Sequence, residues 1–184
     1  MIPKIIHFIW LGKKQMPEEH QNYVKKCKEI MPSYNVMIWN EDNFDFSNCK
    51  YAMEAYNSKK YGFVADYIRI SVLEKYGGIY LDTDVEVLKP FDDLLNCTFF
   101  TCFENDAYVQ TAILGAEKNN QLIKDMKSFY ENKNFIINKK PDLTPNPFYF
   151  TYFLYKNYNL ELYNKQQTLK KDKAFRDIYV IYKD

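Results

Sequence analysis

The stretch GGIYLDTDVEV, residues 77–87, places two aspartates directly after a short apolar segment. The paired glycines are a helix stop signal, and Ile79–Leu81 has the length and composition of a buried strand. Asp82 and Asp84 would then follow the carboxyl end of that strand, which is the edge of an open α/β sheet where ligands bind. If the backbone remains extended, residues i and i+2 point to one side, so we expect both carboxylates to face one ligand.

Two carboxylates that face one point repel each other unless one takes up a proton or a cation lies between them. Oxygen ligands of this type suit Mg²⁺ or Mn²⁺, which keep positions open for water and phosphate oxygens. The Asp82-Thr83-Asp84 motif therefore predicts a divalent metal site. The alternative is an acidic turn on the surface.

Apolar runs and helix signals alternate on both sides of this motif. Residues 4–10 and 34–39 have the pattern of strands, and the helix between them begins at Pro17 and ends before Pro32. This order predicts an α/β fold in which a Rossmann-like, mostly parallel sheet is flanked by helices. We expect one domain over residues 1–184. Further helices are expected over residues 48–59, 63–76 and 121–130, a loop followed by a helix over 143–158, and strands over 79–81, 98–103 and 178–182.

Composition excludes several classes of protein. The net charge of +1 gives no support for nucleic-acid binding through a basic surface. No apolar run approaches the ~20 residues that cross a bilayer, and the N-terminal segment lacks a cleavage site, so it reads as a strand. The four cysteines form no CxxC pair, which disfavours zinc and suggests reduced thiols. We therefore expect a cytoplasmic protein that associates with the membrane, if at all, peripherally.

Asp66 and Arg69 form a second candidate pair. They are three residues apart on the predicted helix over 63–76, so they share a face. An ordinary surface ion pair is the alternative, but the apolar residues around them leave little room for a solvated face. A partly buried acid and guanidinium near a sheet edge are suited to hydrogen-bonding hydroxyls and a phosphate.

Together these residues resemble a known family. IPKIIHFIWLG (residues 2–12) and FVADYIRISVLEKYGGIYLDTDVEVLKPF (residues 63–91) are similar to the DxD-containing sugar transferases of glycosyltransferase family 32. That family includes yeast initiating mannosyltransferases, bacterial capsule and lipopolysaccharide transferases, and glucosylating clostridial toxins. The resemblance extends from Ile2 to about Ala116. It implies a GT-A fold, a nucleotide-sugar donor such as a UDP- or GDP-sugar, and Mn²⁺ or Mg²⁺.

The resemblance also implies roles for particular residues. His7, Trp10 and Leu11 fall where the family holds the nucleotide, and Trp10 could stack on the base. A core position is the alternative for Trp10 and the stronger interpretation for His7. The pair of Asp66 and Arg69 matches the family's grip on the donor sugar and diphosphate. By the same resemblance, Asp82 contacts the ribose or sugar and Asp84 ligates the metal directly.

The resemblance identifies fewer residues that would face the acceptor. Glu104 and Asp106 lie in a stretch that resembles the acceptor-facing part of the family's cleft, although lone acids are more often surface residues. Family members retain the configuration at the anomeric carbon and show no agreed protein nucleophile. We therefore expect retention, a saccharide or lipid-linked acceptor, and no assigned catalytic base. Capsule or lipopolysaccharide assembly is suggested by the bacterial relatives.

The sequence departs from the family after Gly115. Relatives continue past a strand such as IYVIY to a His and a Ser-Trp that close over the metal, whereas this sequence ends at Asp184. The chain is then either naturally short or truncated, and a partner chain could cover the site. Two other functions stay open: a non-catalytic module that binds nucleotide sugars or carbohydrate, and a haloacid-dehalogenase-like phosphatase, whose motif normally lies on the first strand.

Overall fold

One sheet organises the residues that the structure describes, which are 1–163, 165–169 and 178–181 of the computed structural model. The strand order is β2-β1-β3-β5-β4-β9-β8. The strands span Ile5–Ile9 (β1), Asn35–Trp39 (β2), Gly78–Leu81 (β3), Phe99–Cys102 (β4), Ile113–Ala116 (β5), Gln167–Leu169 (β8) and Ile178–Ile181 (β9). A separate two-stranded ribbon pairs β6, Ile136–Ile137, with β7, Lys140–Pro141.

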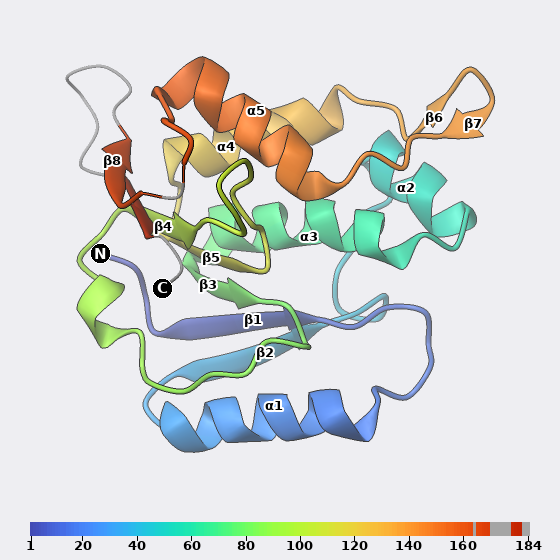
Figure 1. Cartoon of the computed structure of the whole chain (residues 1–184). Helices are drawn as coiled ribbons and strands as arrows, with labels where there is room; N and C mark the ends of the chain where they lie inside the picture. Colours follow the sequence, from blue (N-terminus) through green and yellow to red (C-terminus); the bar gives the residue numbers. More distant parts are fainter. Residues whose placement is uncertain (164, 170–177, 182–184) are drawn as a thin grey trace.

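Helices cover both faces of the sheet (Figure 1). Helix α1 lies alone on one face, and the other four helices lie on the opposite face, with α3 nearest to the strands. Buried residues form two clusters, one on each side of the sheet. The helices span Glu18–Ile30 (α1), Lys50–Asn57 (α2), Tyr61–Tyr76 (α3), Gln121–Glu131 (α4) and Asn146–Tyr158 (α5), and a 3₁₀ turn, η1, spans Asp92–Leu94.

The predicted α/β fold class is confirmed, but the sheet is mixed in direction. Strand β1 pairs in parallel with both β2 and β3, as the β-α-β order predicts. Strand β5 is antiparallel to β3 and β4, and β8 is antiparallel to β9. Strand β5 was not predicted, because its four residues follow a polar loop and carry no turn signal of their own. Residue 182, the end of the last predicted strand, lies outside the described residues.

Gly77 and Gly78 are required by the junction between α3 and β3. Their φ angles are +66° and +107°, in the left-handed region that L side chains rarely adopt. A Cβ at Gly78 would lie 2.5 Å from the carbonyl oxygen of Ile5 and 3.0 Å from the ring of His7. The glycine pair therefore allows α3 to stop and β3 to pair directly against β1.

His7 is a core residue. Its side chain is fully buried, with Nε2 2.8 Å from the carbonyl oxygen of Gly77 and Nδ1 accepting from the indole N–H of Trp39 at 3.0 Å. Both ring nitrogens are thus used inside the protein, which fixes the neutral tautomer with hydrogen on Nε2. Burial lowers the pKa of His7 to about 4, although the hydrogen bond to Gly77 opposes the shift. The core alternative, rather than contact with a nucleotide, accounts for this position.

We expect stability to fall as the pH drops from 6.5 toward 4, because the unfolded histidine takes up a proton that folded His7 takes up only near pH 4. Between about pH 7.5 and about pH 5 this loss should approach ~2 kcal/mol. His7→Gln keeps a donor and an acceptor but does not titrate. Urea unfolding at both pH values should therefore show a smaller pH effect in His7→Gln than in the wild type. His20→Gln removes the chain's other histidine and is the control; an equal reduction there would contradict the assignment.

Candidate active site

The Asp82-Thr83-Asp84 motif forms a turn, so the predicted extended backbone is wrong. The amide of Val85 donates to the carbonyl of Asp82 at 3.1 Å, and Thr83 and Asp84 lie within the turn. The amide of Asp82 donates to the carbonyl of Ala112 at 2.8 Å, which ties the motif to the segment before β5. All three side chains still line one pocket, so the expectation that one ligand could meet both carboxylates stays open.

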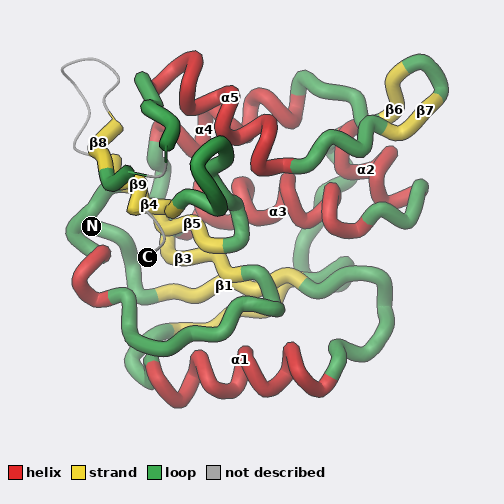
Figure 2. Tube along the Cα trace, in the orientation of Figure 1, coloured by secondary structure: helices red, strands yellow, loops and turns green. Residues whose placement is uncertain are grey.

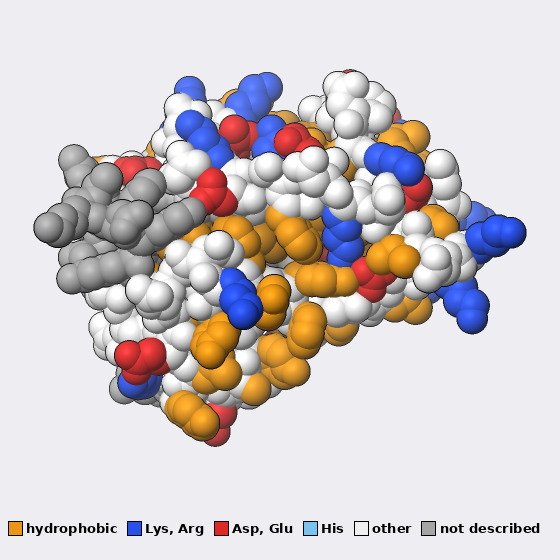
Figure 3. All heavy atoms as spheres, turned by 90° about the horizontal axis from the view of Figure 1, so that it is seen from above, with side chains coloured by type: hydrophobic (Ala, Val, Ile, Leu, Met, Phe, Trp, Pro, Cys, Tyr) orange, Lys and Arg blue, Asp and Glu red, His pale blue; other side chains and the backbone are white. Residues whose placement is uncertain are grey.

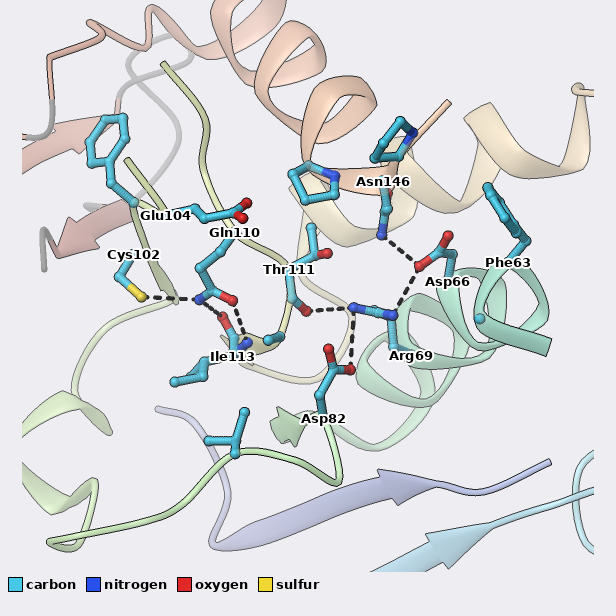
Figure 4. Close-up of a pocket in the computed structure, with 16 residues that line it drawn as sticks. Phe63, Asp66, Arg69, Asp82, Cys102, Glu104, Gln110, Thr111, Ile113 and Asn146 are labelled. Carbon is cyan, nitrogen blue, oxygen red and sulfur yellow. Dashed lines mark hydrogen bonds and ion pairs between the residues drawn. The ribbon is translucent and has the colours of Figure 1, made fainter. Parts of the chain in front are cut away.

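Arg69 on α3 joins three segments that are distant in sequence (Figure 4). Its guanidinium lies 2.9 Å from the carboxylate of Asp66 and 3.6 Å from that of Asp82, and it donates to the carbonyl of Thr111 at 2.6 Å. The guanidinium carbon also lies 4.6 Å from the centre of the Tyr80 ring, a cation–π geometry. Only 7% of the Arg69 side chain is exposed, so the charge is held by protein groups rather than by water.

Asp66 connects this pair to α5. Its carboxylate accepts from the side-chain amide of Asn146 at 3.0 Å, and Asn146 in turn accepts from the hydroxyl of Tyr130. Burial raises the pKa of Asp66 above its ordinary value, although Arg69 favours the charged form. The pair predicted to share a helix face is therefore buried, which excludes the alternative of a surface ion pair.

The two aspartates of the motif have different surroundings. Asp82 accepts from the hydroxyl of Tyr80 and lies beside Arg69, and its side chain is 33% exposed. Asp84 is exposed, and within the described part of the chain its carboxylate has no hydrogen bond or ion pair. Asp82 is thus fixed by protein partners, whereas both oxygens of Asp84 are available to a ligand.

A pocket of about 500 Å³ lies over the motif on the α1 side of Arg69. The segment after β1 forms one wall with Trp10 and Leu11, and the start of α3 forms another with Tyr61. Gly12 has φ of +95°, and a Cβ there would lie 2.6 Å from the Tyr61 ring, so only glycine allows these walls to approach so closely. Trp10 is half-buried, which leaves its ring accessible to the pocket.

His20 on α1 contacts the Asp82-Thr83-Asp84 motif. Its Nδ1 lies 2.9 Å from the hydroxyl of Thr83, and its ring meets Trp10 edge-to-face with centroids 5.7 Å apart. The indole N–H of Trp10 donates to the carbonyl of Lys14 at 2.7 Å, which closes the loop after β1. His20 thus links the wall of the pocket to the turn that carries Asp82 and Asp84.

A second pocket of about 680 Å³ lies on the other side of Arg69 (Figure 4). The two pockets share Gly62, Arg69 and Asp82, so they meet at the charged cluster. Glu104 lines the second pocket, and its acceptor-facing role stays a prediction. Asp106 lies at the exposed tip of the same loop and lines none of the described pockets, which agrees with the alternative of a surface residue.

The residues present fit a Mg²⁺ or Mn²⁺ ion that is held partly by protein carboxylates and partly by phosphate oxygens of a bound ligand. No group of three acidic, histidine or cysteine side chains that could cage a metal is found among the described residues. Asp84, with two available oxygens on the rim of the first pocket, matches a cation bound through one or two carboxylates plus phosphates. Asp82 has less capacity to ligate a metal, because its Oδ1 already lies beside Arg69 and accepts from Tyr80.

Several residues that build the site were not predicted from the sequence. His20, Lys14 and Tyr61 line the first pocket, and Asn146 and Gln110 line the second. His20 and Asn146 reach their partners only through the fold: 63 residues separate His20 from Thr83, and 80 separate Asn146 from Asp66. The one sequence hint was Asn146, which lies between two prolines at the start of an aromatic helix.

The chain is similar in sequence to known glycosyltransferases. Residues 17–101 match a family described as "Glycosyltransferase sugar-binding region containing DXD motif". Inositol phosphoceramide mannosyltransferase 3 of Schizosaccharomyces pombe is 29% identical over 142 residues, which are 73% of this chain and 40% of that protein. An uncharacterized glycosyltransferase of Acanthamoeba polyphaga mimivirus is 37% identical over 106 residues, 54% of this chain and 42% of that protein. The chain thus spans about two fifths of these relatives.

A solved structure shares the fold. The PaToxG glycosyltransferase superimposes with a TM-score of 0.63 over 84% of this chain and 68% of that chain, at 21% sequence identity. At this identity the likeness shows the fold alone. The GT-A architecture and the resemblance to DxD-containing glycosyltransferases are both confirmed.

Loss of the guanidinium should destabilise the protein strongly. Arg69→Met would leave Asp66 buried without its cation, and we expect a loss of about 3–5 kcal/mol in the free energy of unfolding. Lys26→Met is the matched control, because it breaks the ion pair between Lys26 and Glu86, whose side chains are 43% and 46% exposed. That change should cost less than about 1 kcal/mol. Equal losses in urea unfolding would show that Arg69 does not hold the cluster.

Proposed function

We propose that the protein transfers a hexosyl group from a nucleotide-diphosphate sugar to an acceptor hydroxyl, because residues 17–101 match the family model of the DXD-containing glycosyltransferase sugar-binding region. The proposed donor is a UDP- or GDP-sugar, the cofactor is Mn²⁺ or Mg²⁺, and the configuration at the anomeric carbon is retained. The observation that carries the proposal is the meeting of two pockets at Arg69 and Asp82, the arrangement that a donor and an acceptor need.

The donor would occupy the pocket above the DXD turn. Trp10 and Leu11 would contact the nucleotide, with the indole ring stacked on the base. The pocket is also lined by Lys14 and Arg69, whose positive charges would offset the diphosphate. Asp82, held by Arg69 and Tyr80, would accept hydrogen bonds from ribose or sugar hydroxyls. His7 lies in the core and has no direct place in this arrangement.

Asp84 would hold the metal. When bound there, a divalent cation would supply positive charge to offset the charge that develops on the leaving group. Thr83 and His20 would fix the turn that presents Asp84, through their 2.9 Å contact. Asp66 would act through Arg69, because its carboxylate lies 2.9 Å from the guanidinium. In this arrangement the buried groups orient the site, and the exposed Asp84 would gain the metal as its partner when the donor binds.

Transfer would occur where the two pockets meet. The bond between the anomeric carbon and the diphosphate oxygen breaks, and a bond from the acceptor oxygen to the same carbon forms. The leaving diphosphate takes the hydroxyl proton, so no protein nucleophile or catalytic base is assigned. Glu104 lines the acceptor side and is available to hydrogen-bond the incoming hydroxyl or its neighbours.

The acceptor is proposed to be a saccharide or a lipid-linked saccharide. The names of the fungal relatives describe mannose transfer to inositol phosphoceramide, and the bacterial relatives suggested by the sequence resemblance act in capsule or lipopolysaccharide assembly. Among the described residues, none of the helices combines the length and apolar character of a membrane span. We propose that a lipid-linked acceptor would be met by peripheral association at the inner face of the cytoplasmic membrane.

Nucleotide binding should depend on the metal and on Asp84. With UDP, GDP or their sugars at ~100 times the dissociation constant, the folded state should gain about 2.7 kcal/mol. For a chain of this size the melting temperature should rise by very roughly 5–10 °C. We expect this shift with one base only in the presence of Mn²⁺ or Mg²⁺, and we expect Asp84→Ala to abolish it.

Asp93→Ala is the matched control for this experiment. Asp93 is an exposed acid on η1 that lines neither pocket at the site, so its removal should leave the nucleotide shift intact. Failure of every nucleotide to shift the folded wild type, with or without metal, would contradict the transferase proposal for this chain. Binding without sugar transfer or donor hydrolysis would instead support the non-catalytic binding module.

A further inference from the structure

We propose that a neutral glycan acceptor binds across an aromatic platform formed by Tyr108 and Phe148, next to the second pocket. This inference rests on the proposed transferase function and names the chemical class of its acceptor. A hydroxylated ring stacked on the platform would extend toward Glu104 and place a hydroxyl near Arg69 and Asp82. No residue of the DXD sugar-binding region takes part in the platform, since it lies beyond residue 101.

The platform continues the acceptor side of the cleft. A third pocket of about 740 Å³ is lined by Tyr108 and Phe148 and shares Glu104, Pro145 and Pro147 with the second pocket. The three pockets therefore form a row from Trp10, across the charged cluster, to the platform. A donor and an extended acceptor would lie end to end along this row.

The two rings are exposed and close together. Tyr108 is 38% exposed and Phe148 is 47% exposed, and their centroids are 6.3 Å apart with an angle of 47° between the ring planes. Phe148 also packs edge-to-face with Tyr149 at 6.0 Å, which supports its ring from α5. Figure 3, which views the molecule from the α4 and α5 side, shows hydrophobic side chains gathered over the middle of this face. An open aromatic surface of this kind offers stacking to the apolar face of a sugar ring.

The loop that carries Tyr108 is held in place by hydrogen bonds within the protein, before any ligand binds. The amide of Glu104 donates to the carbonyl of Tyr108 at 2.8 Å, and the side chain of Asn105 accepts from the Tyr108 amide at 3.0 Å. The Val109 amide donates to the hydroxyl of Thr151 at 2.8 Å, which anchors this loop to α5. Figure 2 shows the loop between β4 and β5 rising toward α5. A platform that is ordered in advance binds with a smaller entropic cost.

The charge of the third pocket favours a neutral ligand. Its lining contains one charged side chain, that of Glu104, and no lysine or arginine. A phosphate-bearing headgroup would be repelled by the carboxylate and would find no cation to neutralise it. Glu104, Asn105 and Thr144 instead offer a carboxylate, an amide and a hydroxyl, which are the partners that sugar hydroxyls use. We therefore favour a neutral glycan over a phospholipid headgroup.

The test measures binding of defined neutral disaccharides (maltose, cellobiose, lactose and mannobiose) to the full chain by saturation-transfer NMR, with nucleoside diphosphate and the diamagnetic ion Mg²⁺ present. At least one should bind to the wild type. Its affinity should fall about tenfold in Tyr108→Ala and in Phe148→Ala. Tyr108→Phe keeps the ring and should restore binding. Tyr155→Ala is the matched control, because Tyr155 is 56% exposed on α5 and lines none of the five described pockets.

Vesicles of phosphatidylcholine with phosphatidylinositol form the second arm. Vesicle binding that is lost in the platform variants would overturn the proposal in favour of a lipid. Unchanged disaccharide affinity in both alanine variants, or no binding of any disaccharide to the wild type, would also overturn it. The metal-dependent nucleotide shift, measured on the same samples, separates this result from failure of the transferase function: it should persist in every platform variant.

Discussion

Arg69 is the constraint on which the site depends. Its guanidinium is nearly excluded from water, and taking such a charge out of water costs several kcal/mol unless well-placed partners replace the solvent. The partners come from three places: Asp66 on the same helix, Asp82 after β3, and the carbonyl of Thr111 before β5. Satisfying one cation therefore fixes α3, the DXD turn and the β4–β5 loop relative to one another.

The same cluster separates the roles of the two motif aspartates. Asp82 lies beside Arg69 and accepts from Tyr80, so its negative charge is already compensated within the protein. Asp84 is two residues further along the turn and is exposed. A ligand that brings its own negative charge therefore meets one carboxylate that is balanced and one that needs a cation. The repulsion between the two carboxylates that the sequence suggests is resolved in part by Arg69, before any metal binds.

The sequence predicts the half of the fold in which local signals agree with the tertiary structure. The alternation of apolar runs with proline and glycine stops locates β1, α1, β2, α3 and β3, and the left-handed φ angles of Gly77 and Gly78 explain why that stop signal is reliable. The direction of β5 was not predictable in the same way, because it is set by pairing with β3 on one side and β4 on the other. At Gly115 this packing is so close that a Cβ would lie 2.0 Å from the Phe100 ring, a contact no local pattern reveals.

The residues of the candidate site likewise differ in whether local sequence could predict them. Asp66, Arg69, Asp82 and Asp84 could be predicted because two short motifs carry them and burial excludes a solvated helix face. Asn146 and His20 could not, because their partners lie 80 and 63 residues away. The first pocket is therefore built from the first half of the chain, which contains the residues matched by the family model, whereas Asn146, Glu104 and the platform come from later segments. Asn146 and the carbonyls of Thr111 and Ala112 connect these later segments to the buried cluster and the DXD turn, so the cluster constrains the later segments at a few defined points.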